Sequence, residues 1–143
     1  MKFWHVGVIT ANINEAIRSL SGASEYEESS WEIFDVDFPD NEMKTGAGGK
    51  LRAAFGHVGG VPFEILQPLD NASYHAQQLE TRGAGLHHCA YICEDDYQET
   101  VSGLVAAGGS VVWAAKHGKE RPCYIETNGM VLEIINCSPF AQE

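Results

Sequence analysis

The chain has 143 residues, of which 44% are hydrophobic, and its formal net charge is −11. This composition is typical of a compact globular protein, and no apolar run approaches the ~20 residues that a membrane-spanning helix needs. The charge argues against nucleic-acid binding, because phosphates require clustered Lys and Arg and the nine in this chain are scattered.

The first half of the chain predicts the element order β-α-β-β-β. Alternating β-forming residues predict a strand over residues 3–10. Asn12 is a suitable N-cap for the helix that follows, because Glu15 stands at capping-box spacing from it. Three more strands are predicted, at residues 31–38, 51–58 and 61–67, with Gly59-Gly60 as the turn between the last two. The polar stretch 21–30 and the Gly-rich stretch 39–49 are predicted to be loops.

The second half repeats this order after a connection over residues 68–85, which contains a helical stretch near 74–82. A strand is predicted at 86–93, and an apolar stripe predicts a helix over 95–107 that ends at Gly108-Gly109. Three strands follow, at 111–115, 122–126 and 130–136, with Asn128-Gly129 as a hairpin turn. We therefore expect an α+β fold of two βαβββ modules, 1–69 and 85–137, joined by the helical connection within one domain over 1–143.

Each module carries a histidine in its first strand and a glutamate in its last. His5 and His88 are the histidines, and Glu64 and Glu133 lie inside the apolar runs Phe-Glu-Ile-Leu and Leu-Glu-Ile-Ile. A buried carboxylate is costly unless it pairs with a charge or binds a metal. Because side chains alternate faces along a strand, pairing of the first and last strands would bring these residues to one face.

Two imidazoles and two carboxylates form a mixed set of nitrogen and oxygen ligands. Such a set suits a divalent metal ion such as Zn²⁺, Ni²⁺, Co²⁺, Mn²⁺ or Fe²⁺. Positions left open on the ion would accept substrate oxygens, and the ion would stabilise a developing enolate or enediolate. Glu64 or Glu133 is the expected general base, and the combination suits proton abstraction next to a carbonyl.

The other histidines lack this context. We predict that His57, His75 and His117 are surface residues. We also predict that His87 points away from the metal, because neighbours on a strand face opposite sides of the sheet.

The densest group of basic residues lies in the loop that contains Lys116, Lys119 and Arg121. It is a candidate contact for an anionic substrate tail. The alternative is a solvated loop between two strands.

The four cysteines, Cys89, Cys93, Cys123 and Cys137, form no Cys-x-x-Cys pair. The N-terminus enters a strand-like pattern directly and lacks the apolar core of a signal peptide. We therefore expect reduced, mostly buried thiols in a cytoplasmic protein.

The ligand candidates stand in segments that resemble the vicinal oxygen chelate superfamily, which comprises glyoxalases, bleomycin-resistance proteins and dioxygenases. The segments Phe-Glu-Ile-Leu-Gln-Pro-Leu at 63–69 and Gly-Ala-Gly-Leu-His-His-Cys-Ala-Tyr at 83–91 are most similar to the methylmalonyl-CoA epimerase branch. The resemblance implies an open, curved mixed sheet around a metal site, commonly in a homodimer. It also implies that the metal ligands are His5, Glu64, His88 and Glu133.

The chain departs from the patterns of two enzymes of that superfamily. The epimerases share an additional acidic residue on the strand that leads into the middle ligand strand. Residues 45–50 of this chain read Thr-Gly-Ala-Gly-Gly-Lys, so no acidic residue stands at that place. Glyoxalase I has a glutathione-binding Arg shortly after its first ligand histidine, where this chain has Ile9. Pro68 stands where an amide would contact glutathione.

The leading interpretation is a metal-dependent isomerase, epimerase or lyase that acts on a small carbonyl or acyl-CoA-type substrate through an enolate. The alternative is a non-catalytic small-molecule-binding protein of the bleomycin-resistance kind, which does not need four ligands. A ring-cleaving dioxygenase is disfavoured, because such sites use two His and one Glu on Fe²⁺. Residues 31–52 are expected to line the cleft and select the substrate.

Overall fold

A computed structural model describes residues 1–22, 30–116 and 121–137. The described residues form helices α1 (Ile13–Gly22), α2 (Tyr74–Arg82) and α3 (Tyr97–Ala106), and a 3₁₀ turn, η2 (Asp40–Glu42). The strands are β1 (Lys2–Ile9), β2 (Glu32–Phe38), β3 (Met43–Thr45), β4 (Gly49–Val58), β5 (Val61–Pro68), β6 (Gly85–Ile92), β7 (Ser110–Ala115), β8 (Cys123–Thr127) and β9 (Met130–Ile135). None of the described helices is long and apolar enough to cross a membrane.

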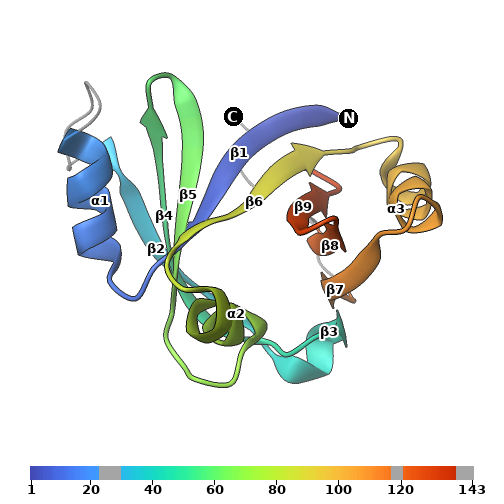
Figure 1. Cartoon of the computed structure of the whole chain (residues 1–143), viewed down its shortest axis with the longest axis horizontal. Coiled ribbons are helices and arrows are strands. Elements are labelled where there is room, and N and C mark those ends of the chain that lie inside the picture. Colours follow the sequence, from blue (N-terminus) through green and yellow to red (C-terminus); the bar gives the residue numbers. More distant parts are fainter. Residues whose placement is uncertain (23–29, 117–120, 138–143) are drawn as a thin grey trace.

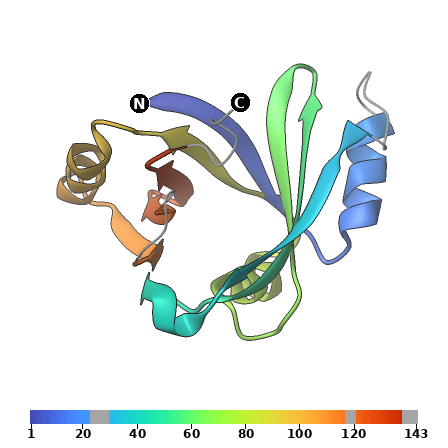
Figure 2. The same cartoon turned by 180° about the vertical axis from the view of Figure 1, so that it is seen from behind.

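The nine strands of the described residues form one mixed sheet in the order β2-β4-β5-β1-β6-β9-β8-β7-β3. The sheet curves into an open half-barrel, with α1 outside one end and α3 outside the other (Figures 1 and 2). Helix α1 packs on β4 and β5, and α3 packs on β7, β8 and β9. Both predicted βαβββ orders are therefore present, and the expected α+β fold with an open curved sheet is confirmed.

The first and last strands of each half pair side by side. Strand β1 runs parallel to β5, β6 runs parallel to β9, and β1 and β6 are antiparallel at the centre of the sheet. The register repeats across this centre. Gly7 on β1 lies opposite both Glu64 and His88, and Ala90 on β6 lies opposite both His5 and Glu133. Each candidate ligand therefore has a glycine or alanine as its neighbour across the central strands.

Local signals explain where the elements begin and turn. The Asn12 side-chain oxygen accepts a hydrogen bond from the Glu15 backbone N–H at 3.2 Å, as expected for the cap of α1. The turns at Gly59-Gly60 and Asn128-Gly129 have positive φ angles at both residues, the geometry of tight hairpins.

Two apolar clusters lie between the sheet and its outer helices. One joins α1 to the first half through Ile13, Ile17, Trp31, Ala54 and Ile65. The other lies under α3 and consists of Cys93, Ala114, Cys123, Ile125 and Ile134. All four cysteines are free thiols, as expected from the sequence. The convex side of the sheet thus holds much of the core.

The segment 39–49, which the sequence predicts to be a loop, contains η2 and the short strand β3. Met43 and Thr45 pair with Ala115 and Ala114 of β7, so a strand from the first half extends the sheet of the second half. Met43 is buried beside Trp113. The loop prediction was wrong here because a strand of three residues is too short to show an alternation of apolar and polar side chains. The strand forms only because it pairs with β7, which is far along the chain. Most of the predicted loop 21–30 lies outside the described residues, and α1 continues to Gly22.

Candidate metal centre and adjoining pocket

The structure brings together His5, Glu64, His88 and Glu133, which come from the four central strands of the sheet. One potential ligand atom of each residue lies within 4.8 Å of the others. The Nε2 atoms of the two histidines are 3.1 Å apart. Each Nε2 is 3.4 Å from Oε1 of both glutamates.

This arrangement fits a divalent metal ion. Donors that share one ion at about 2.1 Å, at an angle of about 90–109°, are roughly 3.0–3.4 Å apart. His5 is 0% exposed, and the buried Oε1 of Glu133 has no hydrogen-bond partner within the described residues. A buried carboxylate oxygen that makes no hydrogen bond recovers only part of its lost hydration from nearby charges. An ion between the four donors would satisfy it.

The protonation of the cluster reflects a competition between burial and charge. Burial alone would lower the pKa of His5, but Glu64 and Glu133 outweigh it and raise the pKa to about 9. The same carboxylates raise the pKa of His88 against the effect of burial. Burial would raise the pKa values of Glu64 and Glu133, and the two histidines hold both values below the ordinary range instead. Metal binding must therefore displace protons from the imidazoles.

A line of hydrogen bonds runs from His88 to helix α2. Nδ1 of His88 lies 2.9 Å from Nδ1 of His87, and Nε2 of His87 lies 3.1 Å from the Tyr74 hydroxyl. Since Nε2 of His88 faces the cluster, its Nδ1 is assigned the proton and donates to His87. Burial, and then the charge of His88, lowers the pKa of His87 to about 2, so this ring is neutral and can accept. His87 is not among the four clustered residues, as predicted, but the sequence did not reveal its contact with His88.

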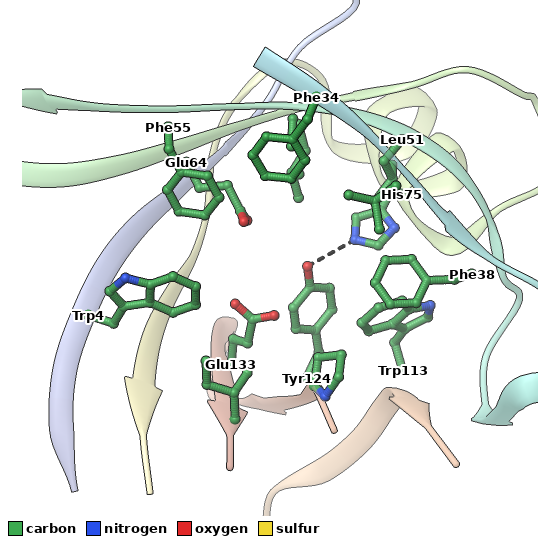
Figure 3. Close-up of a pocket in the computed structure, with 15 residues that line it drawn as sticks. Trp4, Phe34, Phe38, Leu51, Phe55, Glu64, His75, Trp113, Tyr124 and Glu133 are labelled. Atoms are coloured by element: carbon green, nitrogen blue, oxygen red, sulfur yellow. Dashed lines mark hydrogen bonds between the residues drawn. The ribbon is translucent and has the colours of Figure 1, made fainter. Parts of the chain in front are cut away.

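A pocket of about 300 Å³ adjoins the cluster (Figure 3). Glu64 and Glu133 stand in its wall, and the rest of the wall is mostly aromatic or aliphatic. The lining residues are Trp4, Phe34, Val36, Phe38, Leu51, Ala53, Phe55, Glu64, Leu66, His75, Trp113, Pro122, Tyr124, Glu133 and Ile135. Four of them fall within 31–52 on β2 and β4, in agreement with the expected cleft-lining segment.

His75 belongs to this wall, and the prediction that it is a surface residue was wrong. It is only 2% exposed, and its Nε2 lies 2.9 Å from the Tyr124 hydroxyl (Figure 3). Burial, and then the charge of His88, lowers its pKa to about 4. Ser73 caps α2 by accepting a hydrogen bond from the Ala76 N–H, which puts His75 in the first turn of the helix. That serine is the sequence signal that would have located the residue.

Tyr124 was also not singled out from the sequence. Its strand neighbour on β9 is Glu133, and its ring lies 5.1 Å, centre to centre, from that of His88. Burial, and then the charges of Glu133 and Glu64, raises the pKa of Tyr124 well above its ordinary value. The hydroxyl is therefore protonated across the physiological range.

Neither of the described basic residues of the predicted substrate-binding loop, Lys116 and Arg121, is among the residues that line the pocket. The Lys116 ammonium donates to the Asn41 carbonyl at 3.3 Å. The Arg121 guanidinium lies 4.7 Å above the ring of Tyr97. Lys119 lies outside the described residues. A contact between this loop and a substrate tail stays a prediction. Of the other two histidines, His57 is exposed, as predicted, and His117 lies outside the described residues.

The sequence profile of the Glyoxalase/Bleomycin resistance protein/Dioxygenase superfamily matches residues 4–125. The chain belongs to this superfamily, which confirms the resemblance drawn from the sequence. No curated protein matches the sequence.

Solved structures share the fold at low sequence identity. A hypothetical protein from Bacillus halodurans has a TM-score of 0.68 and 18% identity, over 99% of this chain and 98% of that one. Methylmalonyl-CoA epimerase from Mycobacterium tuberculosis has a TM-score of 0.64 and 21% identity, over 96% and 89%. A variant of the Streptomyces coelicolor methylmalonyl-CoA epimerase in complex with 2-nitronate-propionyl-CoA has a TM-score of 0.58 and 17% identity, over 94% and 96%. At these identities the likeness concerns the fold.

Proposed function

We propose that this protein is a metal-dependent isomerase, epimerase or lyase that removes a proton next to a carbonyl group. The observation that carries the proposal is the convergence of four donor atoms, from His5, Glu64, His88 and Glu133, with two of these residues in the wall of a pocket. The donor set suits Zn²⁺, Ni²⁺, Co²⁺, Mn²⁺ or Fe²⁺. When bound, the ion would supply Lewis-acid stabilisation of negative charge on a substrate oxygen.

The chain's own contribution is the proton transfer, which we assign to Glu64 and Glu133. Both carboxylates line the pocket, and they come from β5 and β9 on opposite sides of the central strands. They are the only carboxylates among the lining residues of the described chain. One can remove the proton and the other can return it, so the chemistry does not require the additional upstream acid that residues 45–50 lack.

Solvent exchange tests this assignment. Protein loaded with metal is incubated in D₂O with methylmalonyl-CoA, other acyl-CoA thioesters and hemithioacetals of α-ketoaldehydes, and NMR follows deuterium at the carbon next to the carbonyl. We expect exchange with at least one compound, and a loss of about 10²-fold or more in Glu64→Gln or Glu133→Gln. Glu32→Gln, an exposed glutamate on β2, is the matched control. Exchange that survives in both variants, or that occurs with none of the compounds, would contradict the proposal.

The second candidate is a non-catalytic small-molecule-binding protein of the bleomycin-resistance kind. The mostly apolar wall of the pocket favours it. The converging donors count against it, because binding an apolar ligand does not require them. Metal-free protein that binds an aromatic ligand as tightly as the metal-loaded form, with no exchange in D₂O, would favour this function.

Three expectations from the sequence stay predictions. They are that the protein forms a homodimer, that it is cytoplasmic, and that its partner is a small molecule rather than nucleic acid or a membrane. Light scattering after size-exclusion chromatography measures the mass in solution and thereby tests the dimer. A monomer at micromolar concentration would contradict it.

A further inference from the structure

The pocket has two chemically different sides. Figure 3 shows the carboxylates of Glu64 and Glu133 on one side, and the rings of Phe38 and Trp113 on the other. Phe38 packs edge-on against Trp113, with ring centres 4.9 Å apart. Leu51 packs with Phe38 and completes this second side. A ligand that reaches the carboxylates therefore extends toward an apolar wall.

The polar atoms of the wall are mostly occupied. The Trp113 indole N–H donates to the Ala47 carbonyl at 3.2 Å, and His75 and Tyr124 hydrogen bond to each other. No lysine or arginine is among the lining residues that the structure describes. An anionic group placed beside Phe38 would lose its hydration without gaining a counter-charge. The part of a ligand that lies there should be uncharged.

The size of the pocket limits the ligand further. Its volume of about 300 Å³ is at the lower end of the range of roughly 300–1,000 Å³ for small-molecule sites. A single aromatic ring or a branched alkyl group fits such a space together with a few coordinating oxygens. A nucleotide or a long chain would have to remain outside.

We propose that the substrate carries, beside the end that reaches the His/Glu cluster, a compact, uncharged aryl or branched-alkyl group that packs against Phe38, Leu51 and Trp113. This inference rests on the proposed function for the metal-binding end and names the substrate class of that site. It also holds for a thioester whose acyl part carries such a group, because the remainder then lies outside the pocket.

A matched pair of hydroxamates tests the substrate class. Acetohydroxamate and benzohydroxamate present the same two neighbouring oxygens to a metal and differ in a methyl against a phenyl group. Binding to metal-loaded protein is measured by calorimetry and by the fluorescence of Trp4 and Trp113, which line the pocket. Burial of the phenyl ring should make benzohydroxamate bind about 30-fold tighter or more. A carboxylate at the para position should remove most of that gain. Equal affinities for the methyl and phenyl compounds would overturn the inference.

Variants on one strand locate the contact. Phe38→Ala should weaken benzohydroxamate about tenfold or more and leave acetohydroxamate unchanged. Ile33→Ala is the control, since Ile33 is also on β2, is 48% exposed and does not line the pocket. An equal loss of benzohydroxamate affinity in Phe38→Ala and Ile33→Ala would contradict the placement of the phenyl group against Phe38.

The outcomes separate this inference from the proposed function. If neither hydroxamate binds, the proposed metal-dependent function is contradicted. If both bind with equal affinity, only the inference of an apolar substrate group is contradicted. The para-carboxylate comparison uses wild-type protein, so it remains decisive if Phe38→Ala does not fold.

Discussion

Substitution of Gly7 by alanine should displace His88 and weaken metal binding. Gly7 lies opposite His88 across the central pair of strands. A Cβ at this position would lie 2.0 Å from Cε1, 2.3 Å from Nε2 and 2.4 Å from Nδ1 of the His88 ring. Carbon atoms in contact are about 3.5–4.0 Å apart, so the ring must move by roughly 1.5 Å or more.

The size of the effect follows from this displacement. Forcing an additional methyl into a packed site typically costs about 1–3 kcal/mol, so the variant should fold with reduced stability. Metal affinity should suffer more. Changes to residues that only support metal ligands already cost about 10–100-fold. Displacing one of four donors should therefore cost about 100-fold or more, which corresponds to about 2.8 kcal/mol.

Calorimetric titration with Zn²⁺ and urea unfolding of the metal-free protein measure the two effects separately. Gly103→Ala is the matched control, because the position lies inside α3 and a Cβ there meets nothing within 4 Å apart from the backbone of its own helix. That control should bind metal normally and gain about 0.5–1 kcal/mol of stability. A Gly7→Ala variant whose zinc affinity stays within threefold of the wild type would refute the reasoning.

Three further perturbations probe the surroundings of the cluster. His87→Ala removes the acceptor for Nδ1 of His88 and should lower metal affinity about 10–100-fold in a chelator competition, whereas unchanged affinity would show that the contact does not orient the ligand. Tyr124→Phe leaves the buried His75 without its partner and should cost about 1–3 kcal/mol in urea unfolding; a loss well below 1 kcal/mol would argue against that bond. The raised pKa of His5, about 9, stabilises the metal-free protein fully below pH 6.5 and loses its effect as the pH rises through 9, so unfolding free energy should fall over that interval. Apparent metal affinity should rise over the same pH interval, because a smaller fraction of His5 carries a proton that the metal must displace. The variant His5→Ala should show a flatter dependence of unfolding free energy on pH.

The sequence predicted the features that repeat in both halves. Alternation of apolar residues located the long strands, and matched positions in two modules singled out His5, Glu64, His88 and Glu133. An acidic residue inside an apolar strand is unusual enough to be noticed on its own. Two such residues, each preceded by a strand with a histidine, predicted the cluster before any contact was known.

Features that depend on contacts between distant segments were not predictable in this way. Strand β3 has three residues and exists because Met43 pairs with Ala115, far along the chain. His75 lies on helix α2, whose only buried residues are Tyr74 and His75 in its first turn, so the helix shows no long apolar stripe. The importance of Gly7 appears only when its neighbour across the strands is known to be His88.

The central claim is that His5, Glu64, His88 and Glu133 hold one divalent metal ion. Elemental analysis and equilibrium titration of purified protein with Zn²⁺, Ni²⁺, Co²⁺ and Mn²⁺ test it most directly, alongside His5→Ala, Glu133→Ala and His57→Ala, the last being an exposed histidine away from the cluster. We predict one ion per chain in the wild type and in His57→Ala, and a loss of binding in the other two variants. Full occupancy in His5→Ala, or no binding of any of these ions by the wild type, would contradict it.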